Sequence, residues 1–516
     1  MSAPAPSQDE RPEVLRLEGV TKRFGSLVAN DAIDLELRQG ELLALLGENG
    51  AGKTTLMNIL FGHYTADSGR VVAFGRELPP GKPRAAIEAG IGMVHQHFAL
   101  AGNLTVLDNV MLGTEKLTRF ASDRTAGAKR LAAVAERFGL GVDPAARVGD
   151  LSVGERQRVE ILKSLYRDAR VLILDEPTAV LTTQEAERLF ATLKVMAAEG
   201  LSLIFISHKL GEVMAAADRV TVLRGGKVVA ERRAAATSRA ELAELMVGRR
   251  VARPEREAQA PGPVRLEAVG VDVTEAGTKR LDAVSFAVRS GEVLGIIGVS
   301  GNGQAALGRL VSGLAIPAAG TLSLEGEAPT DFSPRAFVAA GIGRVPEDRN
   351  TEGAVGEMTL WENAVIERLR TPAFSAFGFV RRSKAMAFAR DVIARFDVRG
   401  GGPGTRTRLL SGGNMQKLIL GRNLIDSPRI LIANQPTRGL DEGAIAAVHA
   451  EILAARKAGT AVLLISEDLD EVIGLADRVQ AIVKGRLSPP VPADGLDARR
   501  LGLMMAGLWD EASDAA

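Results

Sequence analysis

The feature that most constrains the fold is a repeat that runs through nearly the whole chain. The glycine-rich segments that begin at Gly47 and Gly298 lie 251 positions apart, and the apolar runs that end at Asp175 and Asn434 lie 259 positions apart. A repeat of this length is far longer than the roughly 20–50 residues of solenoid repeats. The chain is therefore predicted to contain two whole domains of one design, with an insertion of about 8 residues in the second.

Composition limits the possible functions. The chain has 516 residues, 46% of them hydrophobic, and no cysteine, which excludes disulfides and thiolate metal sites. A formal net charge of +1 gives no reason to expect nucleic acid as a partner. Residues 1–13 lack the basic start and apolar core of a secretory signal, and no apolar run reaches the roughly 18 residues needed to cross a bilayer. Any membrane role is therefore expected to come through partner chains.

Each half contains three apolar runs, one that leads into a glycine-rich turn and two that end in polar residues. Such runs, alternating with helical stretches, predict buried strands of a mostly parallel α/β sheet with ligands at the strand tips. The expected strands are residues 41–47, 170–176 and 201–208 in the first half and 292–298, 429–435 and 460–467 in the second. Helices are expected to begin near Lys53 and Gln304, and residues 98–150 and 349–409 are expected to form helical subdomains.

The first glycine-rich segment, GENGAGKTT, fits the pattern GxxxxGK[ST] between a strand and a helix. Backbone N–H groups and the helix N-terminus of such a loop surround phosphate oxygens. Lys53 is expected to reach the β- and γ-phosphates of a nucleotide, Thr54 to bind Mg²⁺ and Thr55 to add a phosphate contact. A glycine-rich turn that merely connects strand to helix is the less favoured alternative. The predicted cradle consists of Gly47, Glu48, Asn49, Gly50, Ala51, Gly52, Lys53, Thr54 and Thr55.

Two acidic residues end the predicted strand at 170–176. Asp175 is the expected partner of Mg²⁺, and Glu176 is expected to polarise the attacking water. On their own the two carboxylates could be only the solvated start of a loop, but the phosphate loop in the same half favours the catalytic interpretation. The sequence therefore predicts an ATPase that uses ATP and Mg²⁺.

Three further motifs point to a family. LSVGERQRVEI (151–161) and LSGGNMQKLIL (410–420) resemble the signature motif of ATP-binding-cassette (ABC) proteins, VHQHF (94–98) resembles the glutamine loop, and ISHKL (206–210) resembles the histidine switch. The chain thus resembles a tandem ABC ATPase over about residues 14–507. The resemblance implies an α/β fold with two tandem P-loop NTPase domains, each with a mostly parallel sheet core, an antiparallel β subdomain and a helical subdomain.

The expected domain organisation follows from the repeat and from a proline-rich stretch, PEREAQAPGP, between the halves. Both ends of the chain are expected to be loose tails. The predicted parts are a tail (1–12), a first ABC ATPase domain (13–249), a linker (250–263), a second ABC ATPase domain (264–507) and a tail (508–516).

The resemblance also implies a head-to-tail sandwich, in which each nucleotide lies between the phosphate loop of one half and the signature of the other. A helix N-terminus with a serine hydroxyl and small glycines suits a γ-phosphate approached from outside. Phe24 could stack on the adenine. A lone histidine or glutamine is usually structural, but the motif context favours function here. The first site would combine the catalytic residues Lys53, Gln96, Glu176 and His208 and the metal ligands Thr54, Gln96 and Asp175 with Ser411, Gly412, Gly413 and Asp441.

The second site would lack the groups needed for hydrolysis. One missing lysine charge about 4 Å from a phosphate is worth roughly 4 kcal/mol at an effective dielectric of 20, and loss of a general base costs about 10²- to 10⁴-fold in rate. Glu347 and Glu467 would add negative charge there, and Glu275 aligns with Phe24. We predict that this site does not turn over ATP. It would combine Gln304, Ala305, Glu347, Asn434, Gln435 and Glu467 with Ser152, Val153, Gly154 and Thr182, which replaces Asp441.

Tandem cassettes without membrane segments resemble the ATPases of bacterial simple-sugar and nucleoside importers, in which the second half is commonly impaired. HQHF (95–98), DEPTAVLT (175–182) and NQPTRGLD (434–441) look more like the nucleoside branch. The resemblance implies two integral-membrane permeases, an extracytoplasmic substrate-binding protein and a peripheral location on the cytoplasmic face of the inner membrane. Gln96 with residues 98–125, and residues 346–353, are expected to contact the permeases.

A soluble tandem-cassette ATPase that acts on the ribosome is the main alternative. Such proteins usually have two competent sites and a long charged helical linker, whereas the linker here is about 15 residues and one site is dismantled. DNA-repair cassettes usually carry zinc-binding cysteines or long coiled coils, and the sequence contains neither. The importer interpretation is therefore favoured.

Overall fold

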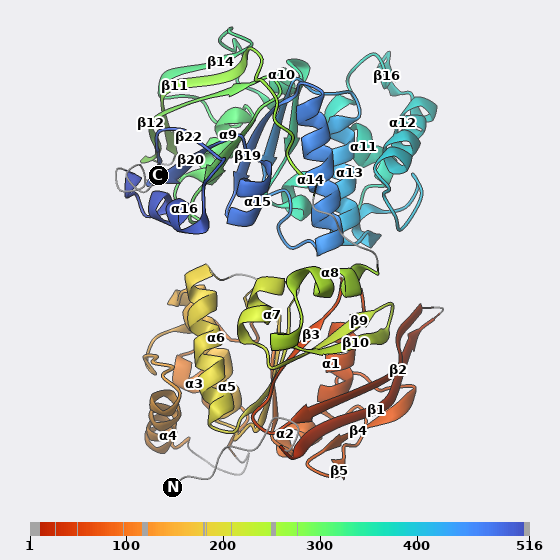
Figure 1. Cartoon of the computed structure of the whole chain (residues 1–516), viewed down its shortest axis with the longest axis vertical. Helices are drawn as coiled ribbons and strands as arrows, with labels where there is room; N and C mark the ends of the chain where they lie inside the picture. The colour runs from red at the N-terminus through yellow and green to blue at the C-terminus, as the bar shows by residue number, and fades with distance from the viewer. Residues whose placement is uncertain are drawn as a thin grey trace. The chain divides into compact units, whose positions relative to one another are not determined.

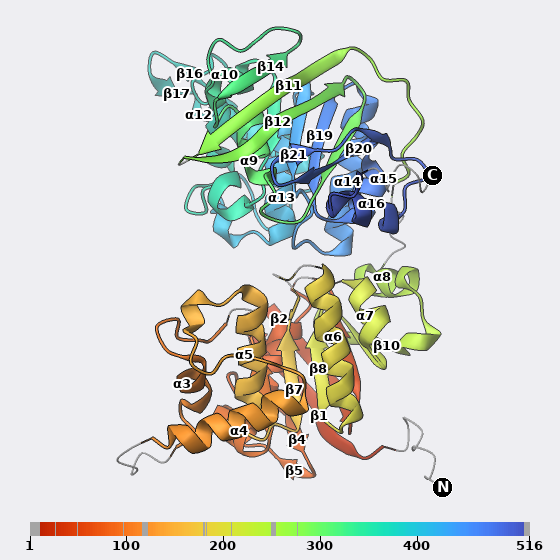
Figure 2. The same ribbon diagram turned by 90° about the vertical axis from the view of Figure 1, so that its left-hand side faces the viewer.

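The computed structural model describes residues 11–25, 27–48, 50–95, 98–115, 122–178, 181, 183–207, 209–248, 254–275 and 277–509. The chain divides into two compact units, Met1–Val251 and Ala252–Ala516. Figures 1 and 2 show the elements of each unit from two directions. Among the described residues, no helix is long and apolar enough to span a membrane.

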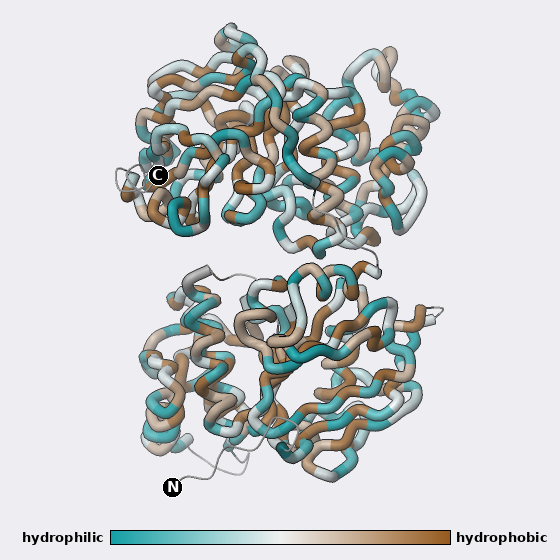
Figure 3. Tube along the Cα trace, viewed as in Figure 1, coloured by the Kyte–Doolittle hydropathy of each residue, from teal (hydrophilic) through white to brown (hydrophobic). Residues whose placement is uncertain are grey.

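The core of the first unit is a six-stranded sheet in the order β10-β9-β3-β8-β7-β6, parallel except for β10. Strands β3, β7 and β8 are buried over their whole length, and hydrophobic residues concentrate along the core strands (Figure 3). Burial on both faces is the usual environment of a parallel sheet covered by helices. The strands are β3 (Leu42–Leu46), β6 (Ile91–Val94), β7 (Val171–Asp175), β8 (Ser202–Ile206), β9 (Arg219–Arg224) and β10 (Lys227–Arg233).

An antiparallel sheet and eight helices complete the described part of the first unit. The sheet has the order β2-β1-β4-β5, with β1 (Glu13–Phe24), β2 (Leu27–Arg38), β4 (Ser68–Ala73) and β5 (Arg76–Glu77). The helices are α1 (Lys53–Phe61), α2 (Pro83–Glu88), α3 (Val106–Met111), α4 (Arg124–Arg137), α5 (Val153–Leu165), α6 (Thr183–Ala198), α7 (Leu210–Ala216) and α8 (Arg239–Val247). Buried residues of α3, α4 and α5 join one hydrophobic cluster with the core sheet, so the helical subdomain is continuous with it.

The second unit repeats this plan. Its core sheet has the order β15-β18-β19-β13-β20-β21, with β22 also paired to β20, and its antiparallel sheet has the order β12-β11-β14. The strands are β11 (Val264–Glu275), β12 (Thr278–Arg289), β13 (Val293–Ile297), β14 (Ala319–Leu324), β15 (Ile342–Val345), β18 (Ile430–Asn434), β19 (Ala461–Ser466), β20 (Arg478–Val483), β21 (Arg486–Leu487) and β22 (Val491–Pro492). The helices are α9 (Gln304–Val311), α10 (Pro334–Ala339), α11 (Leu360–Val365), α12 (Arg382–Arg395), α13 (Gly412–Leu424), α14 (Glu442–Lys457), α15 (Leu469–Leu475) and α16 (Ala498–Met505).

All six strands expected from the apolar runs are present, and α1 and α9 begin at Lys53 and Gln304 as predicted. The helical stretch predicted at 349–409 contains α11 and α12, but it also holds a β-hairpin that was not predicted, β16 (Ser375–Ala376) with β17 (Phe379–Val380). The offset between matching elements grows from 251 at β6 and β15 to 254 at α3 and α11 and 258 at α4 and α12. The extra residues of the second half therefore lie in this region.

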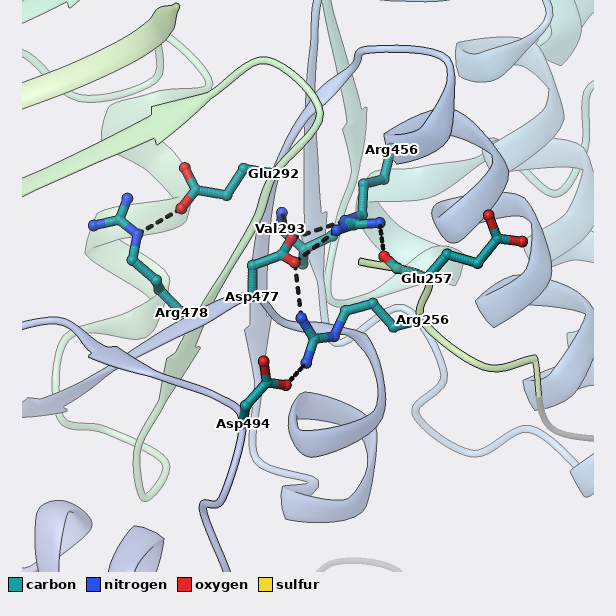
Figure 4. A network of polar contacts seen from close by, with 8 residues as sticks. All are labelled: Arg256, Glu257, Glu292, Val293, Arg456, Asp477, Arg478 and Asp494. Atoms are coloured by element: carbon teal, nitrogen blue, oxygen red, sulfur yellow. Dashed lines mark hydrogen bonds and ion pairs between the residues drawn. The ribbon is translucent and has the colours of Figure 1, made fainter. Parts of the chain in front are cut away.

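The described part of the linker, residues 254–263, packs on the second unit. The guanidinium of Arg256 donates to Asp477 at 2.9 Å and also pairs with Asp494 (Figure 4). Arg456, which is only 2% exposed, holds both oxygens of Asp477 at 2.7 and 2.8 Å and donates to the backbone carbonyl of Glu257 at 3.0 Å. These contacts bind the linker to the sheet of the second unit.

Candidate functional site

The phosphate loop of the first unit connects β3 to α1 and depends on glycine at two packed positions. A Cβ atom on Gly47 would lie 2.3 Å from the carbonyl oxygen of Leu223, and one on Gly52 would lie 2.2 Å from that of Ala29. Gly50 has φ +84°, with open space where a side chain would be. Such a loop exposes backbone N–H groups to a ligand and leaves no side chain in the way.

Lys53 is the first residue of α1 and lies over the loop. Its Nζ atom donates to the carbonyl oxygens of Gly47 at 2.7 Å and Glu48 at 2.9 Å, and the residue is only 6% exposed. A buried ammonium at a helix N-terminus makes the centre of the loop strongly positive, which is the environment a polyphosphate requires.

Asp175 and Glu176 lie at the tip of β7, next to the start of α1. Burial, and then the neighbouring charge of Glu176, raise the pKa of Asp175 to about 6, against a hydrogen bond with Thr54 and the charge of Lys53. The Thr54 hydroxyl and the Asp175 carboxylate are oxygen donors of the kind that Mg²⁺ prefers, so the residues fit this ion. Glu176 has φ +47°, a strained conformation for a residue with a side chain, and its N–H donates to Ile206 at 3.1 Å.

A half-buried carboxylate that was not predicted, Glu212 on α7, connects this tip to the neighbouring strand. It accepts hydrogen bonds from the Thr178 hydroxyl at 2.7 Å and from the Ser207 hydroxyl at 3.0 Å. In the second unit Glu471 accepts from Thr437 at 2.8 Å and from Ser466 at 2.6 Å. Glu212 and Glu471 are 259 positions apart, so the repeat register was the signal that could have found them.

Gln157 of α5 was also not predicted. Its amide donates to the carbonyl of Pro177, as the amide of Gln416 on α13 donates to Pro436 at 2.7 Å. Each signature helix is therefore hydrogen-bonded to the loop that follows the tip of β7 or β18 in its own unit. Asn49, Gln96, Thr182 and His208 lie outside the residues that the structure describes.

Phe24, expected to contact adenine, is the last residue of β1 and is 45% exposed. Its ring packs edge-on against Tyr64 with centroids 5.7 Å apart, and the Lys22 ammonium lies 5.4 Å from its centroid. Tyr64, also exposed, was not predicted. An exposed aromatic pair beside a cation can receive a planar ring.

The signature residues of the second unit form the N-terminus of α13. Ser411 is its N-cap residue and receives hydrogen bonds from Asn414, and a Cβ on Gly412 would lie 2.8 Å from the guanidinium of Arg349. Arg349 donates to the backbone carbonyl of Arg438 at 2.6 Å. In the first unit the matching Ser152 forms a capping box with Glu155, which places a carboxylate at that helix end.

Gly413 and Asp441 occupy structural positions in the same part of the second unit. A Cβ on Gly413 would approach that of Ala444 to 3.0 Å, and Asp441 caps α14 by accepting from the Ala444 N–H at 2.9 Å. Asp441 thus has a capping role that is independent of any nucleotide.

Comparison with known proteins decides the family. A family model described as "ABC transporter" matches residues 30–179 and 281–438. The chain is 45% identical to a glucose import ATP-binding protein of Haloferax volcanii over 98% of both chains. It is 43% identical to a nucleoside import ATP-binding protein of Lactococcus lactis subsp. cremoris over 96% of this chain and 98% of that one. The chain belongs to the ABC transporter family.

The two units are therefore tandem ABC cassettes, and the chain is an ATP-binding ATPase. A solved complex of an archaeal ribosome recycling factor with a ribosomal stalk protein covers 92% of this chain and 90% of its own, with a TM-score of 0.62. At 17% identity this likeness shows the fold alone. The full-length import relatives, at more than twice that identity, support the importer over the ribosomal alternative.

The second cassette keeps the backbone of the phosphate loop but not its charge. Gly301 and Gly303 have φ +88° and +121°, and α9 begins at Gln304. The Gln304 amide donates to Val299 at 2.9 Å, which repeats the contact of Lys53 with Glu48. Its buried Oε1 atom has no partner in the described part of the chain. A neutral amide thus takes the position in the loop that the Lys53 ammonium has in the first cassette.

The strand tip that is acidic in the first cassette is also neutral in the second. Asn434 is buried with its Oδ1 atom unpartnered among the described residues. Gln435 has φ +49°, like Glu176, and its N–H donates to Ile465 at 2.8 Å. The backbone therefore holds amides where the first cassette has carboxylates.

One electrostatic expectation for the second cassette was incomplete. Glu347 and Glu467 were expected to add negative charge to this site, and that expectation did not include Arg438, which forms an ion pair with Glu347. Burial raises the pKa of Glu467, while the charge of Arg438 lowers it. Arg438 is visible in the NQPTRGLD motif, yet only the tertiary structure shows where it points.

Where the first cassette ends β1 with Phe24, the second ends β11 with Glu275, in the same register against the partner strand. Glu275 forms a two-point ion pair with Arg309 of α9, at 2.8 and 2.5 Å. The second cassette therefore offers a salt bridge where the first offers an aromatic pair.

Proposed function

We propose that the chain is the energising subunit of an importer for nucleosides or simple sugars and that only the first cassette hydrolyses ATP. The observation that carries the proposal is that both cassettes keep the same backbone at the phosphate loop and strand tip. Only the first carries Lys53, Thr54, Asp175 and Glu176 on it.

In the proposed reaction the loop backbone and Lys53 bind the β- and γ-phosphates, and Glu176 orients and polarises the attacking water. Thr54, Asp175 and Gln96 would hold Mg²⁺, which supplies charge neutralisation on the phosphates. Phe24 and Tyr64 provide a surface for adenine. His208 would contact the γ-phosphate.

We further propose that Ser411, Gly412, Gly413 and Asp441 complete this site from the second cassette. Support comes from the distribution of sequence departures: the signature expected to serve the degenerate site has Val153 in place of a glycine and adds the Glu155 carboxylate. The α13 N-terminus carries neutral Asn414 at that position instead. Its helix dipole therefore remains available to an anion.

The permease contacts are proposed to lie at the edge of each cassette beside the segments at Gln96 and Glu347. In the first cassette a cavity of about 180 Å³ is lined by Phe61, Met93, His95 and Glu160, among others. The second has a cavity of about 230 Å³ at the matching place, lined in part by Ile342. The two linings differ, which suits two different permease chains.

The cargo and the location are proposals from the family relationship. The named relatives import glucose in one case and nucleosides in the other, and the HQHF, DEPTAVLT and NQPTRGLD motifs favour nucleosides. The chain would act on the cytoplasmic face of the inner membrane with two permeases and an extracytoplasmic binding protein. Uptake of labelled nucleosides and pentoses in a deletion strain tests the cargo. Co-purification with permeases, set against ribosome co-sedimentation, tests the assembly.

The decisive experiment for the ATPase assignment is a matched pair of variants. Lys53→Ala should abolish ATP hydrolysis because it removes the phosphate-binding charge. Gln304→Ala, the same change at the matching residue of the second cassette, should leave most of the rate. Substantial turnover in Lys53→Ala, or loss of turnover in Gln304→Ala alone, would contradict the assignment.

A further inference from the structure

We propose that the β16–β17 hairpin of the second cassette is a membrane-surface anchor, which places two phenylalanines in the headgroup region of an anionic lipid bilayer. The hairpin pairs Ser375 with Val380 and Ala376 with Phe379. Figure 2 shows it at the edge of the second unit, next to α12. Nothing in the ATPase chemistry uses it.

The tip of the hairpin exposes aromatic surface to an unusual degree. Phe377 is fully exposed and Phe379 is 77% exposed. Phe377 and Gly378 form the turn, with φ +51° and +82°. Turns with two positive φ angles favour Asn-Gly or Gly-Gly, and a bulky side chain in this conformation is strained. The sequence therefore accepts both strain and exposure at Phe377, which points to a role for the ring outside the fold.

The two phenylalanines at the tip are exposed although a hydrophobic cluster lies at the base of the hairpin. The third phenylalanine of the segment, Phe374, is buried against Phe388 with centroids 5.2 Å apart and joins a cluster with Val365 and Ala385. The Arg381 N–H donates to the Phe374 carbonyl at 2.8 Å and closes the base of the hairpin. One ring anchors the hairpin and two project from it.

The chain segment that holds the hairpin carries basic residues only, of which Arg368 is paired with Asp426 from another segment. Residues 368–390 contain six basic residues and no acidic one. Arg370, Arg381 and Lys384 are exposed and form no ion pair within the described part of the chain. Exposed aromatic rings flanked by unpaired basic side chains match the chemistry of an anionic membrane surface, where rings enter the interface and cations meet lipid phosphates.

The sequence of the first cassette differs here. Its matching segment, residues 114–132, carries five basic residues but also two acidic ones and a single aromatic residue. The lipid contact is therefore assigned to the second cassette, whose hairpin carries the exposed rings. Glu367 and Arg368, which line the second cassette's cavity, come shortly before β16 in the chain. If the proposed permease docking there is correct, the hairpin lies on the membrane-facing side; the lipid assignment itself does not depend on it.

The test uses the full chain without permeases, co-sedimented with vesicles of phosphatidylcholine alone or mixed equally with phosphatidylglycerol. Wild-type chain should bind the anionic vesicles, and Phe377→Ser with Phe379→Ser should weaken binding about tenfold or more. Replacing Arg370, Arg381 and Lys384 by Gln should remove the preference for phosphatidylglycerol and the salt dependence. Ile316→Ser, which removes another exposed apolar residue of the same unit (69% exposed), is the control and should bind as wild type.

A second measurement uses Phe377→Trp, whose emission should shift to shorter wavelength with anionic vesicles and not with phosphatidylcholine alone. ATP hydrolysis in solution should be unchanged in every hairpin variant, so failure here is separable from failure of the ATPase assignment. Equal vesicle binding by wild type and the double serine variant would overturn the proposal. Loss of permease co-purification without any vesicle binding would overturn it too and show a protein contact instead.

Discussion

At the scale of single residues, the first cassette keeps groups that oppose its own folding. Asp175 is buried beside Glu176, and its pKa is raised to about 6 from 3.8. The folded chain thus binds this proton more tightly than the unfolded chain. Protonation of Asp175 therefore contributes to the stability of the fold. This contribution is fully present below about pH 4 and is lost as the pH rises through about 6. Asn434 holds the same position in the second cassette without this cost.

Asp175→Asn should therefore stabilise the nucleotide-free, magnesium-free chain. At pH 8 the free energy of unfolding of the first cassette should rise by about 2–3 kcal/mol, and at pH 4 it should change little. Asn434→Asp is the matched change and should lower the stability of the second cassette at pH 8. Urea denaturation in EDTA measures both effects; a loss of stability in Asp175→Asn at pH 8 would contradict the argument.

A second residue, Arg349, connects the signature to the neighbouring loop of the second cassette. Its guanidinium lies against Gly412 and donates to the carbonyl of Arg438. Arg349→Gln should leave the fold intact but lower the maximal ATPase rate about tenfold, because the signature would lose a fixed position and a nearby charge. Steady-state kinetics measure the rate, and Arg344→Gln, from a partly exposed ion pair of the same unit, is the control. An unchanged rate would show that Arg349 is not a positioning residue for the proposed composite site.

At the scale of elements, each cassette connects three segments by the same side-chain bonds. A glutamine of the signature helix donates a hydrogen bond to the carbonyl of the proline that follows the strand tip. The threonine after that proline donates a hydrogen bond to a glutamate, which also accepts one from the serine at the end of the next strand. The segments that would sense phosphate are thus coupled by hydrogen bonds, of which those from the threonine and the serine end on a carboxylate. Such bonds are stronger than neutral ones.

Thr178→Val should uncouple these segments in the first cassette, which is proposed to hydrolyse ATP. The valine keeps the shape but removes a donor to Glu212, so kcat should fall about tenfold while ATP binding persists. Thr437→Val makes the same change to Glu471 in the second cassette and should affect kcat much less. Stopped-flow nucleotide binding and steady-state hydrolysis separate the two effects, and equal losses of kcat in both variants would show that the bond is not specific to the working site.

At the scale of the whole molecule, the linker belongs energetically to the second unit. Arg256 and Arg456 converge on Asp477, which also accepts the Val293 N–H at the start of β13 (Figure 4). Burial alone would raise the pKa of Asp477, but hydrogen bonds from Arg456, the Val293 N–H and Arg256 hold it below its usual value. Because the pKa of Asp477 is lower in the folded chain than in the unfolded chain, the ionised carboxylate stabilises the fold at pH values above the unfolded pKa. This stabilisation is lost as the pH falls through the folded pKa.

Arg256→Ala should therefore lower the stability of the second unit by about 1–3 kcal/mol at pH 7 and by less near pH 3. Hydrogen exchange should rise in peptides that cover residues 254–259 and the start of β13. Arg265→Ala, at a partly exposed pair elsewhere in the same unit, is the control and should change stability by under about 1 kcal/mol. An effect of Arg256→Ala that grows toward pH 3 would contradict the proposed role of the Asp477 carboxylate.

The sequence by itself determined the duplication, the core strands, the start of α1 and α9 and the residues of the phosphate loop. These follow from local pattern: buried parallel strands are continuous apolar runs, and glycine spacing reports a backbone that no other residue permits. The tertiary structure decided the rest. Glu212, Tyr64 and Arg438 gain their meaning from partners distant in sequence. Which phenylalanine of the β16–β17 hairpin is buried and which are exposed is set by packing against α12, and local pattern does not encode side-chain direction or burial.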